Sequence, residues 1–287
     1  MVGKLGKRRC GLSEVILVIV LHVFNISGHE KQNDLVYMLM WTSSITDPFA
    51  WMDTDQDTFI SRKCLYQNCF ITNDMAYFQD VSEFDAILFN VVNLQSDMER
   101  PQVRSQKQIY TFVGMQSSSN YPVPDTYNGF FNRTWTYKLD SDIYFGHIII
   151  KDNQDKIIGP KKNMHWMDVK RMRPITKYIK HKLRKKSVAA AWFASNCKTN
   201  SRREVFVSNL SEELARYGHR IDVFGSCGEL ECSVDRMDEC FALVETDYYF
   251  YLAFENALSE DYVTEQVLFA LEHFAVPVVY GGANYTR

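Results

Sequence analysis

The stretch YYFYLAFENALSEDYVTEQ, residues 248–266, begins as a continuous run of aromatic and aliphatic residues and turns polar at Glu255 and Asn256. A continuous apolar run is typical of a strand that is covered on both faces of its sheet. Apolar residues recur at helical spacing from Val263 onward, which predicts a helix that begins near Asp261. The stretch therefore predicts a buried strand with a carboxylate and an amide at its end, followed by a helix.

The neighbouring segments extend this pattern into two β-α-β units. VAAAWFA (188–194) and IDVFG (221–225) predict strands on either side of an amphipathic helix over 203–217. Gly218 ends that helix, and VPVVYG (276–281) is the strand after the second helix. Two such units predict an α/β fold with a parallel sheet, which binds ligands at the carboxyl ends of its strands.

Earlier in the chain, short apolar runs at 35–41, 84–92 and 109–113 predict further buried strands. The aromatic-rich segment 128–150 ends in GHIII, another candidate strand. The segment 167–187 is dense in Lys and Arg. We interpret it as the solvated face of a linker helix in preference to a patch that binds phosphate groups.

The composition is that of a folded protein long enough for two domains. The chain has 287 residues, of which 46% are hydrophobic and 23% charged, and its formal net charge is -3. Because basic and acidic residues are interspersed, we expect no nucleic-acid partner.

The N-terminus has the pattern of a targeting segment. Basic residues come first, at Lys4, Lys7, Arg8 and Arg9. A short apolar run over 15–23 follows, which fits either a cleaved signal peptide or an uncleaved signal anchor with its basic flank in the cytosol. In the second interpretation 1–12 is a cytosolic tail and 13–27 the anchor. Both interpretations place residues 30–287 in the secretory pathway.

The cysteines fit an oxidising compartment. Cys10 lies in the predicted tail, which leaves an even set for disulfides whose pairing the sequence does not determine: Cys64, Cys69, Cys197, Cys227, Cys232 and Cys240. A zinc site is the less favoured alternative, because no His stands at ligand spacing. Glycosylation sequons occur at Asn25, Asn132, Asn209 and Asn284.

The helix predicted after Asn256 would direct unpaired amide N–H groups toward the strand ends, where they favour an anion such as a pyrophosphate. Glu260 and Asp261 fit ordinary helix-start chemistry, whereas Glu265, one turn further in, could accept hydrogen bonds from a ribose diol. The glycine-rich motifs of nicotinamide enzymes and P-loop hydrolases do not occur. These features indicate a nucleotide-linked ligand.

Residues 250–285, FYLAFENALSEDYVTEQVLFALEHFAVPVVYGGANY, resemble the signature of the α1,3/α1,4-fucosyltransferases, glycosyltransferase family 10. Three further blocks agree in order: FFNRTWTYKLDSDIYFG (130–146), VAAAWFASNC (188–197) and IDVFGSCGELEC (221–232). The resemblance covers most of 108–285 and is strongest to the insect C-type members.

This resemblance implies a GT-B fold with two Rossmann-like domains, an acceptor-side domain and linker over 28–186 and a GDP-fucose-binding domain over 187–287. It implies a single-pass type II Golgi membrane protein with a lumenal catalytic region and no obligatory metal or cofactor. The reaction would transfer fucose from GDP-fucose, with inversion and in α1,3 linkage, to N-acetylglucosamine of a glycoprotein or glycolipid glycan. Because the family continues beyond the position of Arg287, we expect the second domain to be incomplete.

The resemblance also assigns site residues. Arg203 matches the arginine that binds the donor pyrophosphate, a role suited to the forked geometry of a guanidinium. Asn256, Tyr262 and Glu265 match donor-contacting positions, with Glu265 at the ribose. Gln116 occupies the position of the catalytic base.

Two positions depart from the family pattern, Gln116 and Gln266. Gln116 replaces the glutamate of the family's E-S pair, and an amide cannot take up the acceptor's proton. The rate should therefore fall unless Asp125 or another carboxylate substitutes. Gln266 replaces the lysine of the family's T-E-K, which removes a cation beside the donor phosphates and should weaken donor binding.

Three alternatives remain. The first is a catalytically impaired relative that binds GDP-fucose or glycan without turnover. The second is a metal-dependent GT-A enzyme, suggested by D-x-D pairs at Asp53 and Asp55, Asp55 and Asp57, and Asp140 and Asp142. We disfavour it, because D-x-D is a very short pattern and the first pair lies in a polar loop. The third is a truncated gene model.

Overall fold

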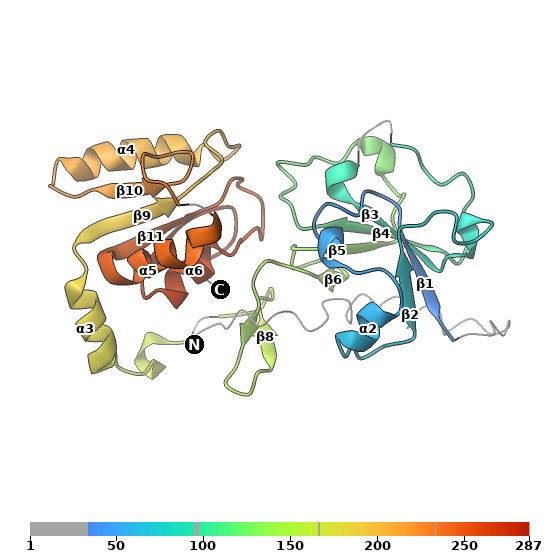
Figure 1. Cartoon of the computed structure of the whole chain (residues 1–287), viewed down its shortest axis with the longest axis horizontal. Helices are drawn as coiled ribbons and strands as arrows, with labels where there is room; N and C mark the ends of the chain where they lie inside the picture. Colours follow the sequence, from blue (N-terminus) through green and yellow to red (C-terminus); the bar gives the residue numbers. More distant parts are fainter. Residues whose placement is uncertain (1–33, 95–97, 166, 233, 287) are drawn as a thin grey trace. The chain divides into compact units, whose positions relative to one another are not determined.

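The computed structural model describes residues 34–94, 98–165, 167–232 and 234–286. Contacts within the chain divide them into two units, the first ending at Gly146 and the second beginning at His147. Each unit contains a parallel sheet, as Figure 1 shows. None of the described helices is long and apolar enough to cross a membrane. The predicted tail (1–12) and anchor (13–27) lie outside the described residues.

The first unit is built on a six-stranded parallel sheet with the strand order β2-β1-β3-β4-β5-β6. The strands are β1 (Val36–Met40), β2 (Cys69–Thr72), β3 (Ala86–Asn90), β4 (Ile109–Gly114), β5 (Arg133–Thr136) and β6 (Ile143–Tyr144). Short helices connect them: η1 (Phe49–Trp51), α2 (Asp57–Ser61), η2 (Val81–Glu83), η3 (Val91–Asn93) and η4 (Asp125–Tyr127).

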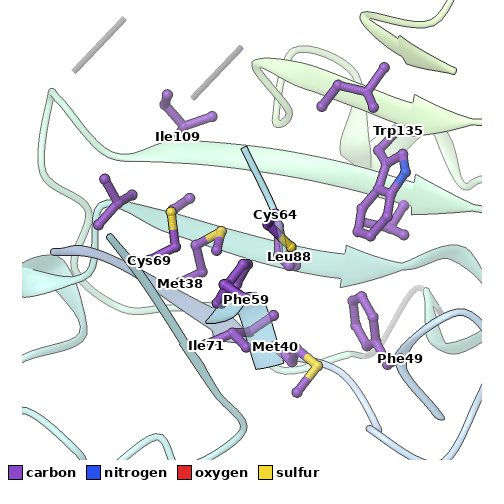
Figure 2. Close-up of a cluster of buried hydrophobic side chains, with 14 residues drawn as sticks. Met38, Met40, Phe49, Phe59, Cys64, Cys69, Ile71, Leu88, Ile109 and Trp135 are labelled. Atoms are coloured by element: carbon purple, nitrogen blue, oxygen red, sulfur yellow. The ribbon is translucent and has the colours of Figure 1, made fainter. Parts of the chain in front are cut away.

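Both faces of this sheet are buried, because its central strands are largely apolar and their polar residues Asn90 and Thr111 are buried as well. Along β1, Met38 belongs to one core cluster and Leu39 to the other. Figure 2 shows the first cluster, formed by side chains from several strands and from the helices that cover one face. The strands predicted over 35–41, 84–92 and 109–113 are confirmed.

The strand predicted at GHIII (146–150) is wrong except at its last residue. Ile150 begins β7 (Ile150–Lys151), which pairs antiparallel with β8 (Ile157–Gly159) in a hairpin of the second unit. The carboxylate of Asp152 accepts hydrogen bonds from the backbone N–H groups of Gln154 (2.9 Å) and Lys156 (3.0 Å) and so stabilises the tight turn. This turn sets the antiparallel pairing of β7 with β8. The apolar run at 146–150 does not encode it.

The second unit contains a four-stranded parallel sheet with the strand order β10-β9-β11-β12. Its strands are β9 (Val188–Phe193), β10 (Ile221–Phe224), β11 (Tyr248–Phe254) and β12 (Val276–Tyr280). Its helices are η5 (Val169–Arg171), α3 (Lys177–Lys185), α4 (Arg203–Ala215), η6 (Val234–Arg236), α5 (Met237–Asp247) and α6 (Gln266–Glu272). The bounds of all four strands match the sequence prediction to within one residue.

Helix α4 also matches its prediction. Val207, Leu210 and Leu214 share one face and pack into the core cluster beside β9 and β11. Gly218 follows with φ +75°, a backbone conformation that glycine adopts without strain and that ends the helix.

Helix α5 was not among the elements predicted from the sequence. Phe241 and Val244 of this helix are buried in the core against β11. Cys240 lies in the helix and is bonded to Cys232. The helix therefore combines an apolar face with a disulfide that ties it to the preceding loop.

The expected pairing of all six cysteines among themselves is wrong. Cys197 is bonded to Cys227, but Cys69 is a free thiol within β2. It is fully buried, and burial raises its pKa to about 12. Cys69 therefore behaves as a small apolar core residue.

The basic segment forms the exposed helix α3, as predicted for a linker. Lys186 is an exception, because its side chain is buried. Its ammonium group donates hydrogen bonds to the carbonyl oxygens of Val244 (3.2 Å), Tyr248 (2.7 Å) and Phe274 (2.8 Å), and burial lowers its pKa to about 8. This lysine joins the end of α3 to the core of the second unit.

Candidate functional site

Three neighbouring strands of the second sheet, β9, β11 and β12, end at the same edge and are followed by polar loops. Ligands of open α/β sheets bind beyond the carboxyl ends of the strands, so a functional site is expected at this edge. Four predicted site residues lie in the segments that follow two of these strands: Arg203 after β9, and Asn256, Tyr262 and Glu265 after β11. The fold therefore brings the four to one edge of one sheet.

Arg203 is the first residue of α4, preceded by Arg202 in a left-handed conformation (φ 55°). The Arg203 side chain is only 8% exposed and donates a hydrogen bond to the carbonyl oxygen of Phe254 at the end of β11. Its guanidinium carbon lies 5.7 Å from the centroid of the Trp192 ring, and its Nε has no hydrogen-bond partner among the described residues. Burial lowers the pKa of Arg203 and Glu255 opposes that shift. A guanidinium remains charged near neutral pH, so a buried cation with an unused donor lies at this edge.

Ser201 ties the loop before α4 to the end of β11. Its hydroxyl donates a hydrogen bond to the carbonyl oxygen of Glu255 (2.7 Å), and its backbone N–H donates to that of Asn256 (3.2 Å). The hydroxyl of Tyr280 in β12 donates to the carbonyl oxygen of Ser201 (3.3 Å). These bonds fix the backbone that carries Arg203 relative to the backbone that carries Asn256.

Glu255 is a buried carboxylate at the centre of the edge. Its Oε1 accepts hydrogen bonds from the backbone N–H (2.7 Å) and the hydroxyl (3.1 Å) of Thr264. Burial raises the pKa of Glu255 to about 7. The bonds from Thr264 and the charge of Arg203 oppose the rise, whereas Glu265 adds to it.

The helix predicted to begin near Asp261 begins at Gln266 instead. Asp261 has φ 60°, which a right-handed helix excludes, and the N–H of Thr264 is bonded to Glu255 rather than to a helical carbonyl. Glu265 is consequently the residue just before the helix, not one turn within it. The loop is long and the helix short, so the predicted role of its N-terminus in anion binding gains no support.

The last residues of this loop contact a residue from the start of the unit. The ring of Tyr262, which is buried, meets the ring of His147 edge to face with centroids 5.8 Å apart. Nδ1 of His147 lies 3.5 Å from Oε2 of Glu265, whose side chain is 44% exposed. Gln266, the second departure from the family pattern, accepts a hydrogen bond from the hydroxyl of Tyr251 through its Oε1 (2.8 Å).

Gln116 lies in the first unit, in the loop directly after β4, and is partly buried. Ser117 beside it is fully buried, and its carbonyl oxygen accepts hydrogen bonds from the N–H groups of Asn120 and Tyr121, both at 3.0 Å. Asp125, considered as a substitute base, is exposed at the start of η4. Gln116 and Asp125 therefore both lie in the segment between β4 and β5, beyond the carboxyl end of β4.

Sequence reasoning missed two residues of the site and gave a third no role. Ser201 was missed although it stands among Thr199, Asn200 and Arg202, a polar cluster typical of a helix start. His147 follows no motif and could not have been found, because its contact with Glu265 is made only by folding. Glu255 was noted at the strand end, but its bond to Thr264 has no signal in the sequence.

The described part of the chain holds no group of three or more His, Cys, Asp or Glu side chains that could bind a metal ion. Two aspartates of the D-x-D pairs have protein partners. Asp53 forms an ion pair with Arg62 (2.9 Å), and Asp142 accepts hydrogen bonds from the N–H (2.8 Å) and hydroxyl (3.0 Å) of Thr134.

Two family models match the chain. Residues 183–287 match the model described as "Glycosyltransferase family 10 (fucosyltransferase) C-term", and residues 33–147 match "Fucosyltransferase, N-terminal". The two matched segments leave the hairpin β7-β8 and most of the basic segment between them.

Among curated relatives, "Alpha-(1,3)-fucosyltransferase C" of Drosophila melanogaster is 35% identical over 263 residues, which are 87% of this chain and 59% of the relative. "Glycoprotein 3-alpha-L-fucosyltransferase A" of the same organism is 29% identical over 79% of this chain and 40% of the relative. The chain thus spans about half the length of these relatives. A crystal structure of an α1,3-fucosyltransferase with GDP aligns over 92% of this chain and 74% of its own, at 15% identity with a TM-score of 0.46.

Proposed function

The chain belongs to glycosyltransferase family 10, the fucosyltransferases, and we propose that it transfers fucose from GDP-fucose to a glycan. The acceptor is an N-acetylglucosamine hydroxyl of a glycoprotein or glycolipid glycan, and the linkage formed is α1,3 with inversion. The names of the Drosophila relatives support the transfer of fucose, the 1,3 linkage and a glycoprotein acceptor.

One observation carries the proposal most directly: Arg203, a buried cation with an unused Nε–H, lies at the edge where Asn256, Tyr262 and Glu265 follow the strand end. In the proposed complex the guanidinium binds the donor pyrophosphate, since charge-assisted bonds from a forked donor suit phosphate oxygens. Glu265, partly exposed, accepts hydrogen bonds from the ribose diol. Asn256 and Tyr262 contact the donor from the same loop.

Each unit supplies one half of a GT-B enzyme in this proposal. The parallel sheet of the second unit holds the donor, and the parallel sheet of the first unit faces the acceptor. Gln116, after β4, stands at the position of the base that deprotonates the acceptor hydroxyl. No metal or other cofactor takes part, because the cationic side chain of Arg203 offsets the charge of the leaving GDP.

We further propose that the protein is a single-pass type II membrane protein of the Golgi with its catalytic region in the lumen. The basic flank before the apolar run at 15–23 supports this orientation. The disulfides Cys197–Cys227 and Cys232–Cys240 support an oxidising compartment.

The alternative, a relative that binds GDP-fucose or glycan without turnover, gains no support from the relatives reported above, whose names are those of transferases. Its basis is the replacement of a family glutamate by Gln116 and of a family lysine by Gln266. A transfer assay therefore tests the proposal and the alternative together.

The assay uses the full chain in detergent, GDP-fucose labelled in the fucose, and glycopeptide and glycolipid acceptors that present N-acetylglucosamine. We expect label in the acceptor, in amounts that a chelator such as EDTA does not change. GDP binding without any transfer would instead favour the non-catalytic alternative, and a loss of transfer with EDTA would contradict the metal-free mechanism.

A further inference from the structure

Glu255 is the most deeply buried carboxylate of the second unit's strand-end edge, with a side chain that is 1% exposed. Both donors on its Oε1 come from a single residue, Thr264, at the far end of the loop that follows β11. Thr264 is the immediate neighbour of Glu265, the residue proposed at the donor ribose. One carboxylate therefore closes the whole loop onto the strand from which it starts.

The backbone of Glu255 is itself held on two sides. Its N–H donates a hydrogen bond to the carbonyl oxygen of Tyr280 in β12 (2.9 Å), and its carbonyl oxygen accepts one from the hydroxyl of Ser201 (2.7 Å). The carboxylate consequently projects from a fixed point of the sheet. Thr264 is thereby fixed with respect to the sheet although it lies in a loop.

A buried carboxylate is unfavourable unless hydrogen bonds and charge compensate for its lost hydration. Thr264 supplies two hydrogen bonds, and Arg203 is close enough for its positive charge to stabilise the ionised form. Gly281 allows a close approach on another side, where an added Cβ would lie 3.1 Å from Cγ of Glu255. An apolar residue at this position would carry a smaller desolvation penalty. The surrounding residues nevertheless accommodate a carboxylate there.

We infer that Glu255 is a positioning residue of the donor site, which holds Thr264 so that the neighbouring Glu265 is placed for the ribose of GDP-fucose. This inference rests on the proposed function. Glu255 itself touches the loop rather than the donor in this account. The ordered loop spares the donor the entropic cost of arranging it on binding.

Four variants test the inference. Glu255→Ala removes both bonds to Thr264, Glu255→Gln retains an oxygen acceptor, Thr264→Val removes the hydroxyl alone, and Thr264→Ser retains it. Thr246→Val is the matched control, since the Thr246 hydroxyl bonds within α5 to the carbonyl oxygens of Ala242 (3.2 Å) and Leu243 (3.4 Å).

We expect the KM for GDP-fucose to rise about tenfold in Glu255→Ala and about threefold in Thr264→Val, in keeping with the loss of two bonds and one bond. Glu255→Gln, Thr264→Ser and Thr246→Val should stay within about twofold of the unaltered protein. The KM for the glycan acceptor should not change in any of them. A merely structural role predicts the opposite pattern, a loss of active protein with both KM values unchanged, and that pattern would overturn the inference.

Hydrogen exchange gives a readout that does not depend on activity. The amide of Thr264 should exchange at least tenfold faster in Glu255→Ala than in Thr246→Val, because its acceptor is gone. Equal exchange in the two variants would refute the positioning role even if the protein is an active transferase. If the unaltered protein neither binds GDP nor transfers fucose, the proposed function fails. The exchange rate of the Thr264 amide in Glu255→Ala then still tests whether Glu255 holds the loop, because this measurement does not require activity.

Discussion

Nδ1 of His147 lies 3.5 Å from Oε2 of Glu265, and the His147 ring packs edge to face on Tyr262. One side chain from the start of the second unit therefore contacts two of the proposed donor-contacting residues. The contact restricts the Glu265 carboxylate, which is otherwise 44% exposed. An imidazole nitrogen at this distance stabilises the carboxylate orientation either as a hydrogen-bond donor or, when protonated, as a cation.

His147→Phe keeps an aromatic ring against Tyr262 but removes the nitrogen that faces Glu265. We predict a rise in the KM for GDP-fucose of up to about fivefold with little change in kcat, because partly exposed ion pairs contribute about 0.2–1 kcal/mol. His147→Gln, which retains a polar group, is the control. A fall in kcat at unchanged donor KM would show that His147 acts elsewhere in the reaction.

Gln116 permits a direct test of the base position. Gln116→Glu supplies a carboxylate directly after β4, and we predict that kcat for fucosyl transfer rises by about 10² or more, the range typical of general-base catalysis. The rate should also become dependent on pH near the pKa of the new carboxylate. If Gln116→Ala transfers fucose as fast as the unaltered protein and Gln116→Glu brings no gain, the base lies at another residue.

The raised pKa of Glu255 predicts a dependence of stability on pH. In the folded protein this carboxyl binds its proton up to about pH 7, whereas in the unfolded chain it loses the proton near 4.5. Between these values the folded state holds the extra proton, so the free energy of unfolding falls as pH rises and becomes level above pH 7.

The size of this effect is about 2 to 3 kcal/mol between pH 5 and pH 8. Glu255→Gln cannot titrate, so the stability of the unaltered protein relative to this variant should fall by that amount. Urea unfolding of both proteins at several pH values measures it. Parallel stability curves would mean that Glu255 is ionised with an ordinary pKa.

The Cys197–Cys227 disulfide joins the loop after β9 to the loop after β10, and the first of these loops leads to Arg203. Its residues are 30 apart, and replacing both by Ser should lower the free energy of unfolding by about 3.5 kcal/mol in the chain-entropy model. The same change at Cys232 and Cys240, which are 8 apart, should cost about 2.5 kcal/mol. We also expect weaker GDP binding only in the variant that lacks Cys197–Cys227. Equal GDP affinity in the two variants would show that this disulfide does not support the donor site.

The sequence predicted the strands that are continuous apolar runs between polar segments, such as β11, and the helix α4, whose apolar face and Gly218 are local features. Strands β2, β5, β6 and β8 were missed because they are short. In β5, Thr134 and Thr136 flank the buried Trp135, and pairing with β4 decides the conformation of the strand. Such strands are set by their neighbours and carry little periodicity of their own.

Tertiary contacts account for the errors at the site and at the domain core. The start of α6 was misplaced because Glu255 takes the N–H of Thr264, a contact no local pattern encodes. Lys186 was predicted to be exposed because it ends a run of basic residues. Its side chain is buried instead, and its ammonium group donates hydrogen bonds to three carbonyl oxygens. The four donor-side residues were predicted from the family pattern, which preserves residues that are distant in sequence and meet only in the fold.

The central claim is that a GDP-linked sugar is held at the carboxyl edge of the second sheet by Arg203, and calorimetric titration of GDP into the full chain tests it most directly. We predict saturable binding by the unaltered protein and by Arg202→Asn, a control that removes the adjacent exposed charge and tolerates the left-handed backbone there. Arg203→Ala and Arg203→Lys should bind GDP at least about tenfold more weakly while their circular dichroism is unchanged. Equal GDP affinity in the folded Arg203 variants, or no GDP binding by the unaltered protein, would contradict the account.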